Sequence, residues 1–210
     1  MKLKDVMEGI AGAVLMAVAI LTPFLRYWRQ WGATDAEVNR ALPGDELVRH
    51  PKGGYTQAIT IQTPRHRVWP WLAQIGQERG GFYSYDFLEN LVGLNIHSVD
   101  RIIPERQHDE KSDGLRLAPK APPVPLVTYE SGRMLLFGGL PVPNTPTSWL
   151  FLLDELDENT TRLITRWRFD FKPSLANRIA CNIFLDPIAR VMQRKMLLGI
   201  KQLAESAREV

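Results

Sequence analysis

Residues 68–90, VWPWLAQIGQERGGFYSYDFLEN, bring aromatic rings and polar groups together more densely than any other part of the chain. The pair Gly80–Gly81 divides this stretch, which predicts a short helix, a glycine hinge and a second short aromatic helix. Each ring taken singly is expected to be core, because large apolar residues are mostly buried for packing. Ligand pockets, however, are apolar walls with a few placed polar groups. The cluster as a whole therefore predicts the mouth of an apolar pocket.

Residues 9–25, GIAGAVLMAVAILTPFL, form an uncharged and mostly apolar run near the N-terminus. A helix of this length spans ~25 Å, just short of the ~30 Å hydrocarbon core of a bilayer. Basic and aromatic residues flank the run, as in an interfacial belt: Lys2, Lys4, Arg26, Tyr27, Trp28, Arg29 and Trp31.

Three interpretations of this run compete: a membrane anchor, a secretory signal peptide and a helix packed in the domain core. The basic start and Ala17-Val18-Ala19 fit a signal peptide, but we favour the anchor because the run continues through Phe24 and Leu25 to Arg26, which fits a signal peptide less well. Residues 1–31 are then an apolar helix that holds the protein to a membrane, and residues 32–55 are a polar tether. Residues 56–210 are the folded domain, which we expect on the cytoplasmic side.

The domain begins with an alternating strand at residues 56–63 and the two short helices described above. Five further strands are predicted: 114–118, 125–129, 133–137, 147–156 and 161–171. A long amphipathic C-terminal helix follows, with a break or restart at Asp186-Pro187.

The last predicted strand has one face that carries Trp167 and another that carries Arg166 and Arg168. Because the Trp167 face is more apolar, we expect it to point inward. The two arginines would then point outward, either as surface residues or as contacts to anionic lipid headgroups.

The segment TQAITIQTPRHRVWPWLAQIGQERGGFYSYDFLENLVGL resembles the start of the SRPBCC superfamily, the START-like group that includes polyketide cyclase/dehydrase-like and lipid-transfer-like proteins. The segments WGATDAEVNRALPGDELV, SVDRIIPE, TRLITRWRF and MQRKMLLGIKQLAE look like one bacterial branch of it, so the resemblance covers about residues 31–206. It implies an α+β helix-grip fold, in which a curved antiparallel sheet wraps around the long C-terminal helix and leaves a cavity between them. One departure is the loop DEKSD at 109–113, where a shorter glycine-aspartate turn is expected.

Composition excludes several functional classes. The 26 basic and 23 acidic residues are spread along the chain, so no basic patch predicts a nucleic-acid partner. The single cysteine, Cys181, cannot form an internal disulfide. There is no glycine-rich phosphate loop, nucleophile elbow or C-x-x-C motif, and we expect no cofactor.

Two sets of residue types could in principle ligate a metal: His97 with Asp100, and Glu105 with His108 and Asp109. These residues lie in a charged segment interrupted by proline, so a solvated loop is the better interpretation and no metal is expected.

Acid–base chemistry is conceivable for Tyr83, Tyr85, Asp86 and Glu89 if they face a cavity, because burial raises a carboxyl pKa. The favoured interpretation is that Asp86 and Glu89 stabilise the start of a short helix through its dipole. No residue is therefore assigned as catalytic.

The function predicted is the binding of an apolar or amphipathic, lipid-like small molecule in a cavity beneath the C-terminal helix. The alternatives are a cyclase or dehydratase acting on a polyketide-like or cyclic substrate, and an interaction domain with a filled core. The sequence leaves the ligand's identity and the oligomeric state open. The predicted ligand-binding residues are Trp69, Trp71, Phe82, Tyr83, Tyr85, Asn90, Trp149, Trp167 and Met192.

Overall fold

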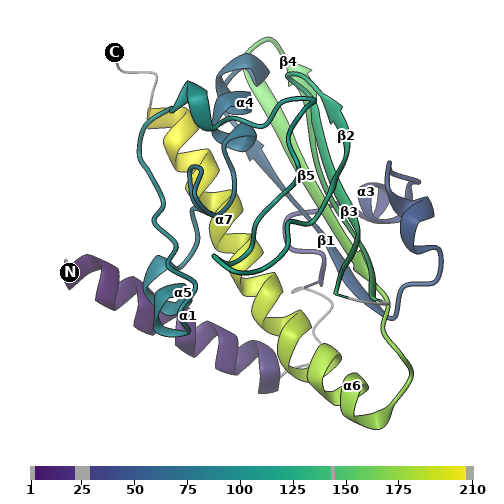
Figure 1. The fold of residues 1–210 in the computed structure, drawn as a ribbon. Helices are drawn as coiled ribbons and strands as arrows, with labels where there is room; N and C mark the ends of the chain where they lie inside the picture. The colour runs from purple at the N-terminus through teal and green to yellow at the C-terminus, as the bar shows by residue number, and fades with distance from the viewer. Residues whose placement is uncertain (1–2, 22–28, 143–144, 207–210) are drawn as a thin grey trace.

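The computed structural model of the chain describes residues 3–21, 29–142 and 145–206 (Figure 1). Its elements, in chain order, are α1 (Leu3–Leu21), α3 (Asp35–Asn39), η1 (Asp45–Val48), β1 (Gly53–Ile61), α4 (Arg65–Ala73), α5 (Asp86–Leu91), η2 (Pro104–Arg106), β2 (Leu126–Glu130), β3 (Met134–Val142), β4 (Thr145–Asp157), β5 (Thr160–Phe169), α6 (Leu175–Ile179), η3 (Ala180–Leu185) and α7 (Asp186–Ser206).

The five strands form one antiparallel sheet in the order β1-β5-β4-β3-β2, and α7 lies across one of its faces (Figure 1). The predicted α+β architecture, with an antiparallel sheet and a long C-terminal helix, is confirmed. The predicted strand at 114–118 is not part of the sheet, since Leu115 makes only an isolated bridge to Val124. We call the face of the sheet under α7 the inner face.

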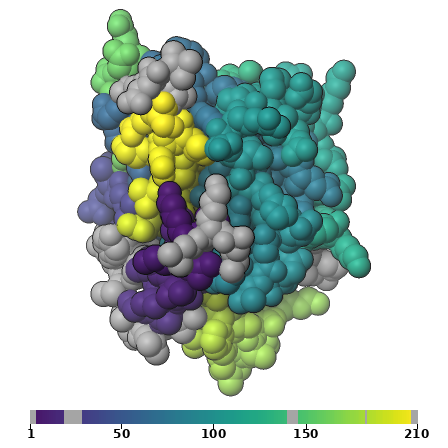
Figure 2. Space-filling model, turned by 90° about the vertical axis from the view of Figure 1, so that its left-hand side faces the viewer, coloured from purple at the N-terminus to yellow at the C-terminus, as the bar shows by residue number. Residues whose placement is uncertain are grey.

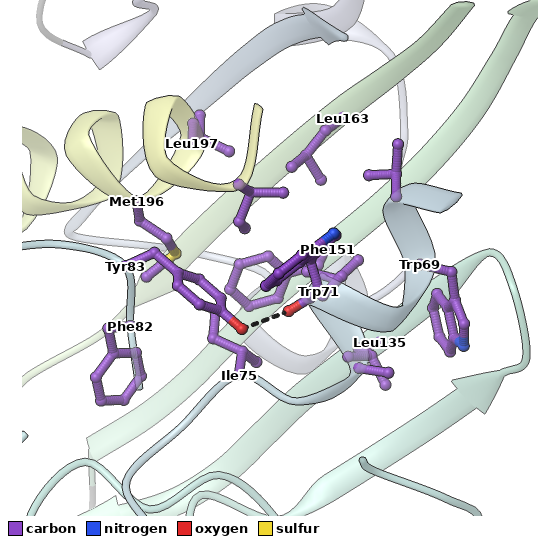
Figure 3. Packing of buried hydrophobic residues seen from close by; sticks show 14 of the residues in the cluster. Trp69, Trp71, Ile75, Phe82, Tyr83, Leu135, Phe151, Leu163, Met196 and Leu197 are labelled. Atoms are coloured by element: carbon purple, nitrogen blue, oxygen red, sulfur yellow. Dashed lines mark hydrogen bonds between the residues drawn. The ribbon is translucent and has the colours of Figure 1, made fainter. Parts of the chain in front are cut away.

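The core fills the space between the inner face, α4 and α7. Trp71, Ile75 and Tyr83 pack there against Phe151 of β4 and Leu197 of α7 (Figure 3). Because α7 carries apolar side chains at helical spacing and the strands alternate, both elements bury their apolar sides in the same layer.

The outer face is covered by residues 32–50, part of the segment predicted to be a tether. Thr34 and Glu37 form the expected capping box at the start of α3. Arg166 of β5 points outward, as predicted, but it is only 3% exposed. Its guanidinium donates to the carbonyl oxygens of Glu37 and Val38 at 2.7 and 2.9 Å.

Further donors of the same guanidinium bind Asp45 Oδ2 at 2.7 Å, the Arg40 carbonyl at 3.0 Å and Thr56 Oγ1 at 3.0 Å. A cation at the C-terminal end of α3 satisfies carbonyls that the helix itself leaves without partners. The segment thus contacts the sheet along its length, while the division of the chain at residues 31 and 55 stays a prediction.

The N-terminal helix differs from the expectation. The predicted apolar helix at 9–25 is not supported in that form, because α1 begins at Leu3 and includes the charged residues Lys4, Asp5 and Glu8. Residues 22–25 of the prediction lie outside the described residues. Across the described ranges, no helix has both the length and the hydropathy needed to cross a bilayer, so the predicted membrane anchor finds no support.

One side of α1 packs on the domain (Figure 2). Gly9 and Gly12 allow α1 to approach the rings of Phe87 and Tyr85, where a Cβ atom would clash. Lys195 of α7 donates to Glu8 at 2.9 Å. The other side leaves apolar residues exposed: Met7, Ile10, Val14 and Val18. Contact between this side and a membrane stays a prediction.

Replacing Arg166 with Met tests the outer-face contact. We expect the free energy of unfolding to fall by roughly 3 kcal/mol, because the change leaves Asp45 and several α3 carbonyls without their buried partner. Urea denaturation followed by circular dichroism measures it. The control Arg133→Met removes an exposed ion pair with Glu130 and should change stability by less than about 0.5 kcal/mol. Equal effects of the two substitutions would contradict this account of the outer face.

Candidate functional site

The inner face carries a continuous set of aromatic rings, here called the aromatic platform. Its members are Tyr55, Phe82, Trp149, Phe151, Trp167, Phe169 and Phe171. Trp149 and Trp167 are cross-strand partners in β4 and β5, so their rings are neighbours, with centroids 6.0 Å apart. Both tryptophans are only half-buried, although the face they occupy is the one that α7 covers. Part of each ring is therefore available to a ligand.

The indole N–H groups of the platform are already bonded. Trp149 Nε1 donates to Gln193 Oε1 of α7 at 3.1 Å, and Trp167 Nε1 donates to Thr147 Oγ1 at 2.8 Å. Gln193 also donates to Thr165 Oγ1 at 2.8 Å. These bonds fix the two indoles and the helix relative to each other. What remains for a ligand is the apolar face of each ring.

A buried ion pair lies at the start of α7 next to the platform. Arg190 donates to Asp186 Oδ2 at 3.0 Å, and both side chains are almost fully buried. Burial raises the pKa of Asp186, while Arg190 and Arg29 act to lower it. The Tyr55 hydroxyl donates to the Ala189 carbonyl at 3.3 Å, and Gln57 donates to the Arg190 carbonyl at 3.2 Å.

Three of the predicted ligand-binding residues meet in the platform. Phe82 stacks on Trp149 with ring centroids 6.5 Å apart, and Trp149 adjoins Trp167. Phe82 comes from the loop after the Gly80–Gly81 pair, so the glycine hinge does deliver a ring to the inner face. These three form the part of the predicted wall that the fold brings together.

Trp69, Trp71 and Tyr83 lie deeper in the core, with exposures of 8%, 5% and 4% (Figure 3). Trp69 packs edge-on against Tyr129, away from the platform. The Tyr83 hydroxyl accepts from Gln74 at 2.9 Å and donates to the Trp71 carbonyl at 3.2 Å. These contacts are those of well-packed core side chains.

Tyr85, Met192 and Asn90 lie outside the platform. Tyr85 packs with Val191 against α1, and Met192 borders that cluster. Asn90 donates to the Ile96 carbonyl at 2.7 Å and accepts from the Ile96 amide, so it closes the loop after α5. The fold therefore divides the predicted set among the platform, the core and the α1 side.

Tyr55 and Gln193 were missed by the sequence analysis. Tyr55 meets Trp167 edge-on at 5.6 Å, and Gln193 holds Trp149. The only available signal for Tyr55 was its place just before the predicted first strand. Gln193 is a polar residue on the helix side that packs against the sheet, where a polar side chain needs a partner.

Glu89 of α5 is the unexpected group of this region. It is 2% exposed, and neither carboxylate oxygen makes a hydrogen bond of good geometry among the described residues, although the nearby Ser84 hydroxyl acts to lower its pKa. Burial, with repulsion from Asp86, raises the pKa of Glu89 to about 7. Asp86 differs, since its two oxygens accept from the Ser98 amide at 2.6 Å and the Ser98 hydroxyl at 2.7 Å.

His108 is a second buried ionisable group in this region. Its Nε2 lies 3.0 Å from the Ile75 carbonyl and its ring packs on Phe137. Burial, with repulsion from Arg79, lowers the pKa of His108 to about 4. His97, by contrast, is exposed. Within the part of the chain that the structure describes, no group of three or more His, Cys, Asp and Glu residues could hold a metal ion.

Comparison with known proteins gives the following. No family model matches the chain, and no curated protein matches it. A solved polyketide cyclase-like protein from Corynebacterium glutamicum is 17% identical with a TM-score of 0.34, covering 74% of this chain and 93% of that one. A conserved protein from Geobacillus kaustophilus is 14% identical with a TM-score of 0.38, covering 73% of this chain and 95% of that one.

An aromatase/cyclase, Zhui, from Streptomyces sp. R1128 is 11% identical with a TM-score of 0.33, covering 75% of this chain and 98% of that one. The neighbours thus include a polyketide cyclase-like protein and an aromatase/cyclase. At these TM-scores the likenesses carry no argument about a ligand or a reaction, which must come from the site itself.

Glu89 and His108 give opposite pH dependences. Folding raises the pKa of the Glu89 carboxyl from 4.5 to about 7, so the folded protein loses stability as the pH rises through that range. Folding lowers the pKa of the His108 imidazole from 6.5 to about 4, so the folded protein loses stability as the pH falls from 6.5 towards 4. Glu89→Gln removes the first effect. The free energy of unfolding of this variant, relative to that of the natural protein, should therefore rise by roughly 3 kcal/mol between pH 4 and pH 8.

Urea unfolding across that pH range measures the difference. The exposed carboxyl of Glu105 supplies the control, and Glu105→Gln should show no such trend. A difference between Glu89→Gln and the natural protein that stays constant with pH would rule out the buried ionisation.

Proposed function

We propose that this protein binds an apolar or amphipathic small molecule on the aromatic platform between α7 and the sheet. The observation that carries the proposal is the half-buried state of Trp149 and Trp167, two neighbouring rings on the inner face. Their N–H groups are bonded within the protein, so the ring faces are the surfaces offered to a ligand. Covering about 100 Å² of such surface contributes roughly 2.5 kcal/mol.

The polar groups near the platform support the same proposal. Gln193, Thr165 and Thr147 bind one another or the indoles, and Asp186 binds Arg190. A fully hydrophilic ligand would have to compete with these internal bonds, whereas an apolar ligand leaves them in place. A lipid-like molecule is therefore a better match than a sugar or a nucleotide.

The second candidate function is a cyclase- or dehydratase-type enzyme, and Glu89 is the observation that favours it. A carboxyl with a pKa near 7 exchanges protons readily at neutral pH and suits general acid–base catalysis. A buried carboxyl without a partner is also the group a reactive substrate would engage. The binder remains the better-supported proposal, because Glu89 lies on α5 and outside the platform.

Substitution of the tryptophans tests the binder. We expect Trp149→Ala and Trp167→Ala in the full chain to retain at least tenfold less co-purifying apolar ligand than the natural protein. Each loses an aromatic contact surface. Native mass spectrometry, followed by organic extraction, measures the bound molecule. The matched control is Trp69→Phe, in the core and away from the platform, which should retain it. Equal retention by all four proteins would exclude the platform as the site.

Glu89→Gln separates the two candidate functions. For an enzyme, turnover of a polyketide-like substrate should fall by about 100-fold or more, because general acid–base catalysis contributes about that factor. For a binder, Glu89→Gln should hold its ligand as the natural protein does. Liquid chromatography of the substrate after incubation measures the first outcome, and native mass spectrometry measures the second. Absence of turnover by the natural protein on a panel of such substrates would count against the enzyme.

A further inference from the structure

A pocket of about 290 Å³ opens at the free edge of β1, where this strand begins. It is lined by residues of β1, by the end of β5 and by residues just before β1 and after the described end of α1. Tyr55 and Trp167, two members of the aromatic platform, belong to its lining. Val38, Arg166 and Arg168, which also line it, belong to the outer face, so the pocket lies at the β1 edge, where the two faces of the sheet meet.

Two glycines at the start of β1 border this pocket. A Cβ atom on Gly53 would collide with the ring of Phe169, and one on Gly54 would collide with the Trp167 carbonyl. Gly54 also has a φ of +143°, which residues with side chains rarely adopt. Glycine at these two positions therefore lets the start of β1 pair closely with β5 beside the pocket.

The described lining is cationic. It includes Arg29, Lys52, Arg166 and Arg168, and none of its described residues is acidic. The counter-ions Asp45, Asp170 and Asp186 stand outside the lining. A concave surface bordered by charges of one sign concentrates a positive potential.

Three of the four cations can reach a ligand. Arg166 is buried, and its guanidinium already donates hydrogen bonds to residues 37–45. The Arg29 side chain is 51% exposed, and its ion pair with Asp186 spans 3.6 Å. Lys52 and Arg168 are 38% and 26% exposed. Arg168 shares Asp45 with Arg166, so an incoming anion can replace part of that contact.

We propose that the pocket binds the acid group, a carboxylate or a phosphate, of an amphipathic ligand whose apolar part lies on the aromatic platform. The inference rests on the proposed function and specifies the ligand class as an amphipathic acid. Guanidinium groups bind carboxylates and phosphates through charge-assisted hydrogen bonds, which a neutral ligand of the same length cannot form. Tyr55 and Trp167 belong both to the lining of the pocket and to the platform.

The test compares three probes of equal chain length on the full protein: dodecanoate, dodecanol and dodecylamine. Quenching of tryptophan fluorescence and isothermal titration calorimetry measure binding. We expect dodecanoate to bind roughly tenfold tighter than dodecanol, equivalent to about 1.4 kcal/mol, and dodecylamine to bind weakest. Added NaCl should reduce the advantage of the acid, since a partly exposed charge contact is screened.

Arg29→Gln and Arg168→Gln should each remove most of the difference between dodecanoate and dodecanol while leaving dodecanol binding unchanged. Arg29→Gln is the safer variant for folding because of the exposure of its side chain, and circular dichroism checks both. Lys120→Gln, at an exposed position outside the pocket, is the matched control and should keep the preference for the acid.

The outcomes separate the inference from the proposed function. Equal affinity for the acid and the alcohol overturns the inference and leaves the binder standing. Binding of none of the three probes overturns both. Binding of inorganic phosphate alone, sensitive to Arg29→Gln and without any binding of dodecanoate, identifies a site for a free anion and overturns the amphipathic ligand.

Discussion

The inner half of the molecule depends on the contact between α7 and the sheet. Apolar packing alone leaves a helix free to slide along a sheet, because hydrophobic burial is not directional. Here Gln193 links Trp149 to Thr165, and Gln57 reaches the Arg190 carbonyl, so polar bonds fix the position of the helix along the strands. The bond to Gln193 also fixes the indole of Trp149, and a separate bond to Thr147 fixes that of Trp167.

The outer face of the sheet is covered by a polar segment that is held by contacts of a different kind. A sheet with one face on a core can leave the other to water, but here that face holds a row of arginines that is itself covered. Arg166 binds main-chain carbonyls at the end of α3, and Arg162 makes paired contacts with Glu37 at 2.7 and 2.8 Å. Leu42 of the covering segment also packs in an apolar cluster with Leu136 and Leu150, so charge-assisted hydrogen bonds and apolar contacts together hold the segment on the sheet.

The aromatic platform lies between a polar interior and a cationic edge. At its inner end Gln193 and the Asp186–Arg190 pair make bonds within the protein, and at the β1 edge Arg29, Lys52 and Arg168 retain exposed surface. This gradient from apolar rings to exposed cations is the feature an amphipathic acid would match. Glu89 lies apart from it on α5, without a counter-ion, and adds a titrating group that a passive binder does not require.

Much of the architecture was predictable because it depends on local patterns. Alternation in the last strand placed Trp167 inward and Arg166 outward, and the Thr34–Glu37 capping box was readable from spacing. The contacts of α1 were not predictable in this way. The apolar run in α1 suits a membrane as well as a protein surface, and only the packing of Gly9 and Gly12 against two rings shows which contacts it makes.

The sequence by itself determined the order of the elements, the inward face of β5 and the identity of three platform rings, since periodicity reports which side of an element is apolar. Only the tertiary structure decided the partners. Arg166 and Asn90 bind main-chain groups, and every residue has the same main chain, so no pattern of side chains could name Glu37, Val38 or Ile96 as their partners. The division of nine predicted wall residues among platform, core and α1 side has the same origin. A helical or strand period tells which way a side chain points but not what it meets there.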